Sequence, residues 1–121
     1  QDARPAAMAA MEAFAQKGDA GFWQMHDLLF ANQQALDPAS LEGYARKLGL
    51  DSVKFRAALS GGVHDGAIAA DLAAGKAAGA SGTPSFVING YAISGAQPLR
   101  AFKKVIDRAL EDAKLGRTPA P

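Results

Sequence analysis

Over most of the first 79 residues, apolar side chains recur at the three- and four-residue spacing of amphipathic helices. Glycines suited to ending a helix, Gly18 and Gly49, follow apolar runs, and aspartates suited to capping one, Asp37 and Asp51, precede them. This punctuation predicts helices at 6–16, 20–31, 38–48, 51–59 and 63–79. The apolar positions expected to pack together are Phe22, Met25, Leu29, Phe30, Leu41, Tyr44, Ala45, Leu48, Val53, Phe55 and Leu59.

The pattern becomes strand-like after residue 84. Residues 86–88 read Phe-Val-Ile, a continuous apolar run expected for a strand covered on both faces. Asn89-Gly90 favours a two-residue type I′ turn, because both central residues of that turn need positive φ, and residues 91–93 then return antiparallel. A last helix is predicted from 97 to about 115, with an apolar face made of Leu99, Phe102, Val105, Ile106, Ala109 and Leu110.

Composition narrows the possible classes of protein. A chain of 121 residues is one domain or part of one, and its 49% hydrophobic and 21% charged residues are typical of a globular fold. Thirteen basic residues are scattered among twelve acidic ones, so no basic patch indicates a nucleic-acid partner. The longest apolar stretches are also far shorter than a membrane span.

Candidate chemistry within the chain is sparse. There is no cysteine, which excludes disulfides, thiolate catalysis and cysteine-ligated metal in these residues. The two histidines, His26 and His64, fall in different predicted elements without a third ligand at a recognisable spacing. We therefore expect no metal site and no cofactor, and a structural role for His26 beside an apolar helix face.

The most specific motif is Thr83-Pro84, followed by the hairpin, Gly95 and a helix. This arrangement resembles the second half of the thioredoxin core in the DsbA-like family of thiol-disulfide oxidoreductases, and residues 22–30 resemble a helix of that family's inserted helical domain. The resemblance covers essentially the whole chain. It implies a partial α/β, thioredoxin-like fold that is mostly helical, with an inserted domain at 1–79, the second half of the core at 80–116 and a tail at 117–121.

The resemblance also implies a function. Members exchange disulfides with cysteine-containing proteins through a Cys-x-x-Cys pair. The expected substrates are therefore cysteine-containing proteins or peptides that are exported, and the expected location is periplasmic or otherwise extracytoplasmic. It implies that the backbone of Thr83 pairs with substrate as an added strand and that Pro84 is cis beside the cysteines; otherwise Pro84 simply starts a strand. The cysteine pair is expected before residue 1, which makes this chain a fragment that cannot perform thiol chemistry alone.

Two other functions remain open. One is a cysteine-free peptide-binding or chaperone-like domain that uses Thr83-Pro84 without redox chemistry. The other is a thioredoxin-fold isomerase linked to glutathione. A further expectation follows if strands missing from this fragment normally pair with residues 86–88. The fragment would then expose an apolar edge, which predicts a homodimer or higher assembly formed by strand pairing or segment exchange.

Overall fold

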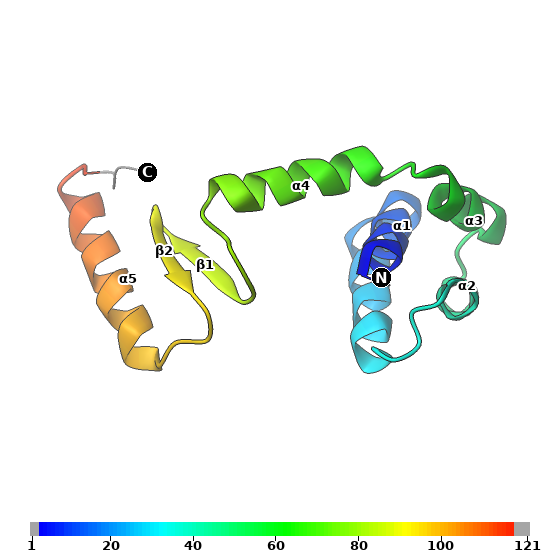
Figure 1. Ribbon diagram of the computed structural model, residues 1–121, viewed down its shortest axis with the longest axis horizontal. Helices are drawn as coiled ribbons and strands as arrows, with labels where there is room; N and C mark the ends of the chain where they lie inside the picture. The colour runs from blue at the N-terminus through cyan, green and yellow to red at the C-terminus, as the bar shows by residue number, and fades with distance from the viewer. Residues whose placement is uncertain (1–2, 118–121) are drawn as a thin grey trace. The chain divides into compact units, whose positions relative to one another are not determined.

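The computed structural model describes residues 3–117, which form five helices and a two-stranded antiparallel sheet (Figure 1). All of the predicted tail except Arg117 lies outside these residues. The mostly helical partial fold expected from the sequence is confirmed. The elements are α1 (Ala3–Ala31), α2 (Pro38–Lys47), α3 (Ser52–Gly61), α4 (Asp65–Ala77), β1 (Ser85–Ile88), β2 (Tyr91–Ser94) and α5 (Leu99–Lys114).

The chain divides into two compact units, residues 1–69 and 70–121, with the division inside α4. We call them the helical unit and the hairpin unit. The first contains α1, α2 and α3, which pack on one another, and the second contains β1, β2 and α5.

Helix α1 is two helical arms joined at Gly18, which has φ 64° and ψ −155°. The break predicted between two helices is therefore present, although the first arm begins at Ala3 rather than at residue 6. The two arms approach each other closely at Gly21, since a Cβ atom there would meet the carbonyl oxygen of Ala13 and the Cβ of Lys17. The absence of a side chain at Gly21 thus lets the second arm fold back on the first.

The core of the helical unit lies where α1, α2 and α3 meet. Phe55, Met25 and Leu41 are its largest fully buried side chains. Small residues surround them, and partly buried apolar side chains complete the cluster. Val53 was expected to pack but is 75% exposed, because it lies on the side of α3 away from this core. The other buried members are Ala9, Ala10, Ala13, Ala45 and Leu50.

Two aspartate caps fix where α2 and α3 begin, as predicted. Asp37 accepts hydrogen bonds from the amides of Ala39 and Ser40, both at 3.1 Å, and Asp51 accepts from the amides of Val53 and Lys54. The hydroxyl of Ser40 holds the pKa of Asp37 below its usual value, and the amide of Lys54 does the same for Asp51. Each cap therefore contributes stability above the ordinary carboxyl pKa and loses it as the pH falls through the lowered value.

The hairpin has the predicted turn and register. Asn89 and Gly90 both have positive φ, 47° and 87°, and Phe86 pairs with Ile93 across the two strands. The ring of Phe86 meets that of Phe102 on α5 edge to face at a centroid distance of 4.9 Å. The strand is not covered on both faces within the described residues, since Val87, on the opposite face of the strand from Phe86, is 52% exposed.

A polar contact also holds α5 to the hairpin. The hydroxyl of Tyr91 donates to Asp112 at 2.5 Å and accepts from Nε of Arg108 at 3.0 Å. The Arg108 guanidinium carbon also lies 5.3 Å from the centre of the Tyr91 ring, and its hydrogen bond to Tyr91 raises the pKa of Arg108. One tyrosine thus links the end of the turn to two successive turns on one face of α5.

Candidate functional site

The loop between α4 and β1 presents Thr83 and Pro84, the two residues predicted to contact substrate. The peptide bond between them is cis, and both residues are exposed. The amide of Gly95, just after β2, donates to the carbonyl of Pro84 at 2.9 Å, and the hydroxyl of Ser85 donates to the carbonyl of Gly82. These bonds fix the end of the loop against the hairpin.

Thr83 differs from its neighbours because its own backbone groups are not used. Within residues 3–117, neither its amide nor its carbonyl has a hydrogen-bond partner. The edge of β1 that faces away from β2 has no strand beside it in the described part of the chain. An exposed backbone donor and acceptor at the head of an open strand edge can pair with an extended polypeptide.

A buried polar cluster that no sequence pattern predicted lies inside the helical unit. Nε2 of His64 lies 2.7 Å from a carboxylate oxygen of Glu12, and the two side chains are only 12% and 8% exposed. Gln16 donates to the other oxygen of Glu12 at 2.7 Å, and its own side-chain oxygen accepts from the amide of Asp51. The cluster links α1 to the segments that precede α3 and α4. The only sequence signal for it was Glu12, the single charged residue within the alanine-rich run at 6–13.

Neither histidine belongs to a metal site in the described residues, where no group of three or more potential ligands is found. His26 is 35% exposed at its side chain, with Nδ1 3.1 Å from Asp27. Its ring lies between those of Trp23 and Phe30, at centroid distances of 5.1 and 4.5 Å. The ring therefore lies beside an apolar helix face, where the sequence pattern places it.

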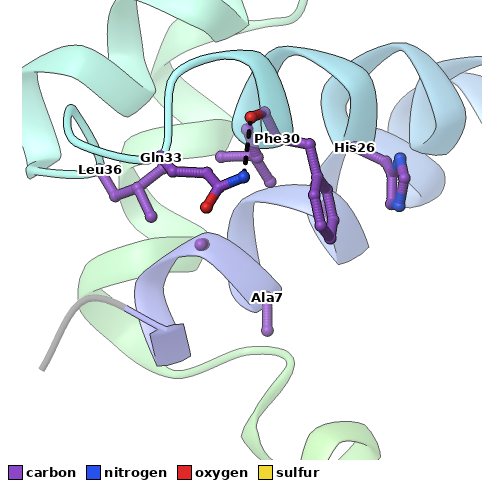
Figure 2. Close-up of a pocket in the computed structure, with 8 residues that line it drawn as sticks. Ala7, His26, Phe30, Gln33 and Leu36 are labelled. Carbon is purple, nitrogen blue, oxygen red and sulfur yellow. Dashed lines mark hydrogen bonds between the residues drawn. The ribbon is translucent and has the colours of Figure 1, made fainter. Parts of the chain in front are cut away.

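The helical unit also contains an apolar cavity of about 420 Å³, formed between the two arms of α1 and the segment that follows them. Figure 2 shows Ala7, His26 and Phe30 around it, together with Gln33, whose side chain donates to the carbonyl of Phe30 at 3.2 Å. Its size falls within the range of small-ligand pockets, and its walls are almost wholly apolar. The full set of lining residues is Ala6, Ala7, Ala10, His26, Leu29, Phe30, Gln33 and Leu36.

A smaller cavity of about 340 Å³ lies beside Trp23. Its other walls are Met11, Phe14 and Phe22, and Asp19 is the only charged residue that lines it. Trp23 is therefore part of a surface hollow and is 58% exposed. The chain's one tryptophan is not a core residue.

Comparison with known proteins identifies relatives over nearly the whole chain. The chain is 39% identical to "Na(+)/H(+) antiporter NhaA 1" of Salinispora arenicola over 94% of its own length and 18% of that protein. It is 39% identical to "Na(+)/H(+) antiporter NhaA 3" of Salinispora tropica over 98% of the chain and 19% of that protein. The third, "Na(+)/H(+) antiporter NhaA" of Herminiimonas arsenicoxydans, is 34% identical over 96% of the chain and 18% of that protein.

The chain thus spans about a fifth of the length of the curated relatives it matches. Among residues 3–117, no helix has both the length and the apolar character needed to cross a membrane. No solved structure matches the chain. The model of the DSBA-like thioredoxin domain matches residues 1–107, and the chain belongs to this family.

Proposed function

We propose that the chain supplies the polypeptide-binding part of a thiol-disulfide exchange site, with Thr83 and Pro84 as the residues that contact substrate. The observation that carries the proposal is the unpaired backbone of Thr83 at the head of an open strand edge, in a member of the DSBA-like thioredoxin domain family. A cysteine-containing segment would lie along this edge as an added strand.

The exchange itself needs two thiols that these 121 residues do not contain. In the forward direction, a substrate thiolate attacks a sulfur of the site's disulfide, and the other sulfur of that disulfide leaves as a thiolate. A second substrate thiolate then attacks the mixed disulfide, which oxidises the substrate pair and reduces the site. The chain's contribution is to hold the substrate backbone in place while sulfurs from outside this sequence react.

The proposed substrates are exported proteins, and the proposed location is the periplasm or another extracytoplasmic space. Structural disulfides form and persist in such oxidising compartments, whereas cytosolic thiols are kept reduced. This location rests on the family's chemistry.

The first test compares the 121-residue chain with the whole protein encoded by its gene, using oxidation of a reduced two-cysteine peptide. The whole protein is expected to catalyse oxidation and the chain alone to show none, because it has no thiol. A whole protein without a Cys-x-x-Cys pair would contradict disulfide exchange. If it still bound peptides at Thr83, the cysteine-free binding function would be favoured, and action on glutathione conjugates alone would favour the isomerase.

A sharper version of the same test asks whether the backbone of Thr83 is the contact. N-methylation of successive peptide residues removes one amide donor at a time, and in a paired strand only alternate amides face the partner. We expect a two-residue periodicity in affinity, with losses of about two- to tenfold at alternate positions, the effect of removing one hydrogen bond. The intervening methylated peptides are the matched controls, and equal losses at all positions would exclude strand addition.

A second proposal follows from the relatives, which are named as Na⁺/H⁺ antiporters. Because they align with 94–98% of this chain, we propose that the domain can occur as one part of an antiporter polypeptide. The sequence on both sides of the 121 residues tests this directly. Flanking segments that align with the remaining four fifths of those relatives would support it, and the exchange assay above would then be made on that longer protein.

We also propose that the isolated chain self-associates through β1. Strand β1, whose outer edge is open, carries Phe86 and Val87, which are 39% and 52% exposed, and open apolar edges recruit further strands. Sedimentation should show a dimer or larger assembly whose population rises with concentration, and Val87→Lys should shift it towards monomer. Ala92→Lys, on the neighbouring strand β2, is the matched control for an added charge, and a wild-type monomer at millimolar concentration would contradict the proposal.

A further inference from the structure

Aromatic side chains line one side of the second arm of α1. Rings of Trp23, His26 and Phe30 follow one another at centroid distances of 5.1 and 4.5 Å, and we call them the aromatic strip. Trp23 is 58% exposed and Phe30 is 63% exposed. Contiguous apolar surface of this kind is typical of an interaction site.

The strip has a cavity at each end. The cavity of about 340 Å³ adjoins Trp23, and the cavity of about 420 Å³ adjoins Phe30 (Figure 2). Phe30 follows Trp23 by seven positions along the helix, which places the two ends about 10 Å apart along the axis. A polypeptide in the polyproline II conformation rises about 9 Å in three residues and completes one turn, so side chains three residues apart point to the same side.

Two carboxylates lie beside Trp23, and one of them, Asp27, lines a hollow together with Lys17 and Lys47. Asp19 precedes Trp23 by one helical turn and Asp27 follows it by one turn, so both carboxylates neighbour the indole on the helix surface. Asp19 lines the Trp23 cavity, and its carboxylate has no hydrogen-bond or ion-pair partner in the part of the chain that the structure describes. Neither cavity is lined by a lysine or an arginine.

We infer that the aromatic strip binds a polypeptide segment that places a lysine or arginine in the Trp23 cavity and an apolar side chain, three residues away, in the Phe30 cavity. A long basic side chain suits the first cavity because its hydrocarbon stem packs on apolar walls while its cation reaches the indole and Asp19. The second cavity offers no charge and takes an apolar group. A single amine could fill only one of them.

The inference rests on the proposed function only in taking a polypeptide as the ligand. The strip lies in the helical unit, and Thr83 lies in the hairpin unit. Probe peptides without cysteine therefore test the strip independently of disulfide exchange, and a failure here would leave the exchange assay unaffected.

Because Trp23 is the chain's one tryptophan, its fluorescence reports on the strip. The full 121-residue chain is titrated at low ionic strength with acetyl-Ala-Arg-Ser-Thr-Leu-Ala-amide, and with the same peptide carrying glutamine for arginine or serine for leucine. We expect saturable binding of the first peptide and weaker binding of the other two. Raising the salt concentration should remove most of the advantage of arginine over glutamine.

Two substitutions locate the contacts. Asp19→Asn should lower the affinity for the arginine peptide about three- to fivefold, the effect of one exposed ion pair. It should leave the affinity for the glutamine peptide unchanged. Asp71→Asn, an exposed carboxylate on α4, is the matched control and should change neither. Phe30→Ala should abolish the preference for leucine over serine, and circular dichroism checks that each variant remains helical.

The inference is overturned if the glutamine peptide binds as tightly as the arginine peptide, or if Asp19→Asn and Asp71→Asn have equal effects. It is also overturned if Trp23 emission changes with protein concentration alone and peptides have no further effect. That result would assign the strip to contact between two copies of the chain.

Discussion

Replacing Glu12 by alanine is expected to lower the free energy of unfolding of the helical unit by about 3–5 kcal/mol, as for other broken buried pairs. One carboxylate oxygen of Glu12 lies 2.7 Å from Nε2 of His64, and the other accepts a hydrogen bond from Gln16. Alanine would leave Nε2 of His64 without its partner in a site from which water is largely excluded, and would leave the amide nitrogen of Gln16 with only its 3.3 Å bond to the carbonyl of Asp51. Urea unfolding followed by helical circular dichroism and by Trp23 fluorescence measures the loss.

The control removes Glu12 and His64 together. Glu12→Met combined with His64→Leu takes away the charge and the donor at once, so it should cost clearly less than Glu12→Ala alone. Glu12→Gln, which keeps an acceptor oxygen, should also cost less. A loss below about 1 kcal/mol for Glu12→Ala would mean that the carboxylate behaves as an exposed one, and the buried cluster would be wrong.

Substituting alanine for Gly21 is expected to destabilise the helical unit by about 1–3 kcal/mol, even though alanine is the better helix former. The added methyl group would meet the backbone carbonyl of Ala13 and the Cβ of Lys17. A backbone atom cannot swing aside as the end of a side chain can, so the two arms of α1 would have to separate. Thermal unfolding of the variant gives the size of the effect.

Gly43 is the matched control, since it also lies inside a helix but has no atom within 4 Å of the position a Cβ would take. Gly43→Ala is expected to stabilise the chain by up to about 1 kcal/mol. The two substitutions are chemically identical and should have opposite signs. If both stabilise the protein, the arms do not pack as closely as described.

Features that depend on neighbouring residues were predictable from the sequence. Asp37 and Asp51 cap the helices they precede, and Asn89-Gly90 forms the predicted turn, because each satisfies a backbone requirement within two or three residues. The pairing of Glu12 with His64 spans 52 residues, and no local pattern indicates it. The close contact at Gly21 was missed for the same reason, since it depends on the direction in which the chain turns at Gly18.

In the candidate site, too, features set by neighbouring residues were predictable and others were not. Residue spacing predicts a strand after Pro84, but the interpretation of Thr83 as a substrate contact came from the family resemblance rather than from local chemistry. Trp23 shares its helix with buried residues, and spacing alone cannot separate a wide apolar face into a core side and an outer side. In the structure Met25 is fully buried, while Trp23 is left on the outside.

Helix α4 is expected to open locally before the rest of the helical unit unfolds. None of its 13 residues is buried, so it lacks the packing that stabilises α1, α2 and α3. An unsupported helix of this length is marginal in water, and Gly66 and Gly75 weaken it further. Local opening is therefore cheapest in the stretch between the two units, and α4 can fray and re-form while the core around Phe55 stays intact.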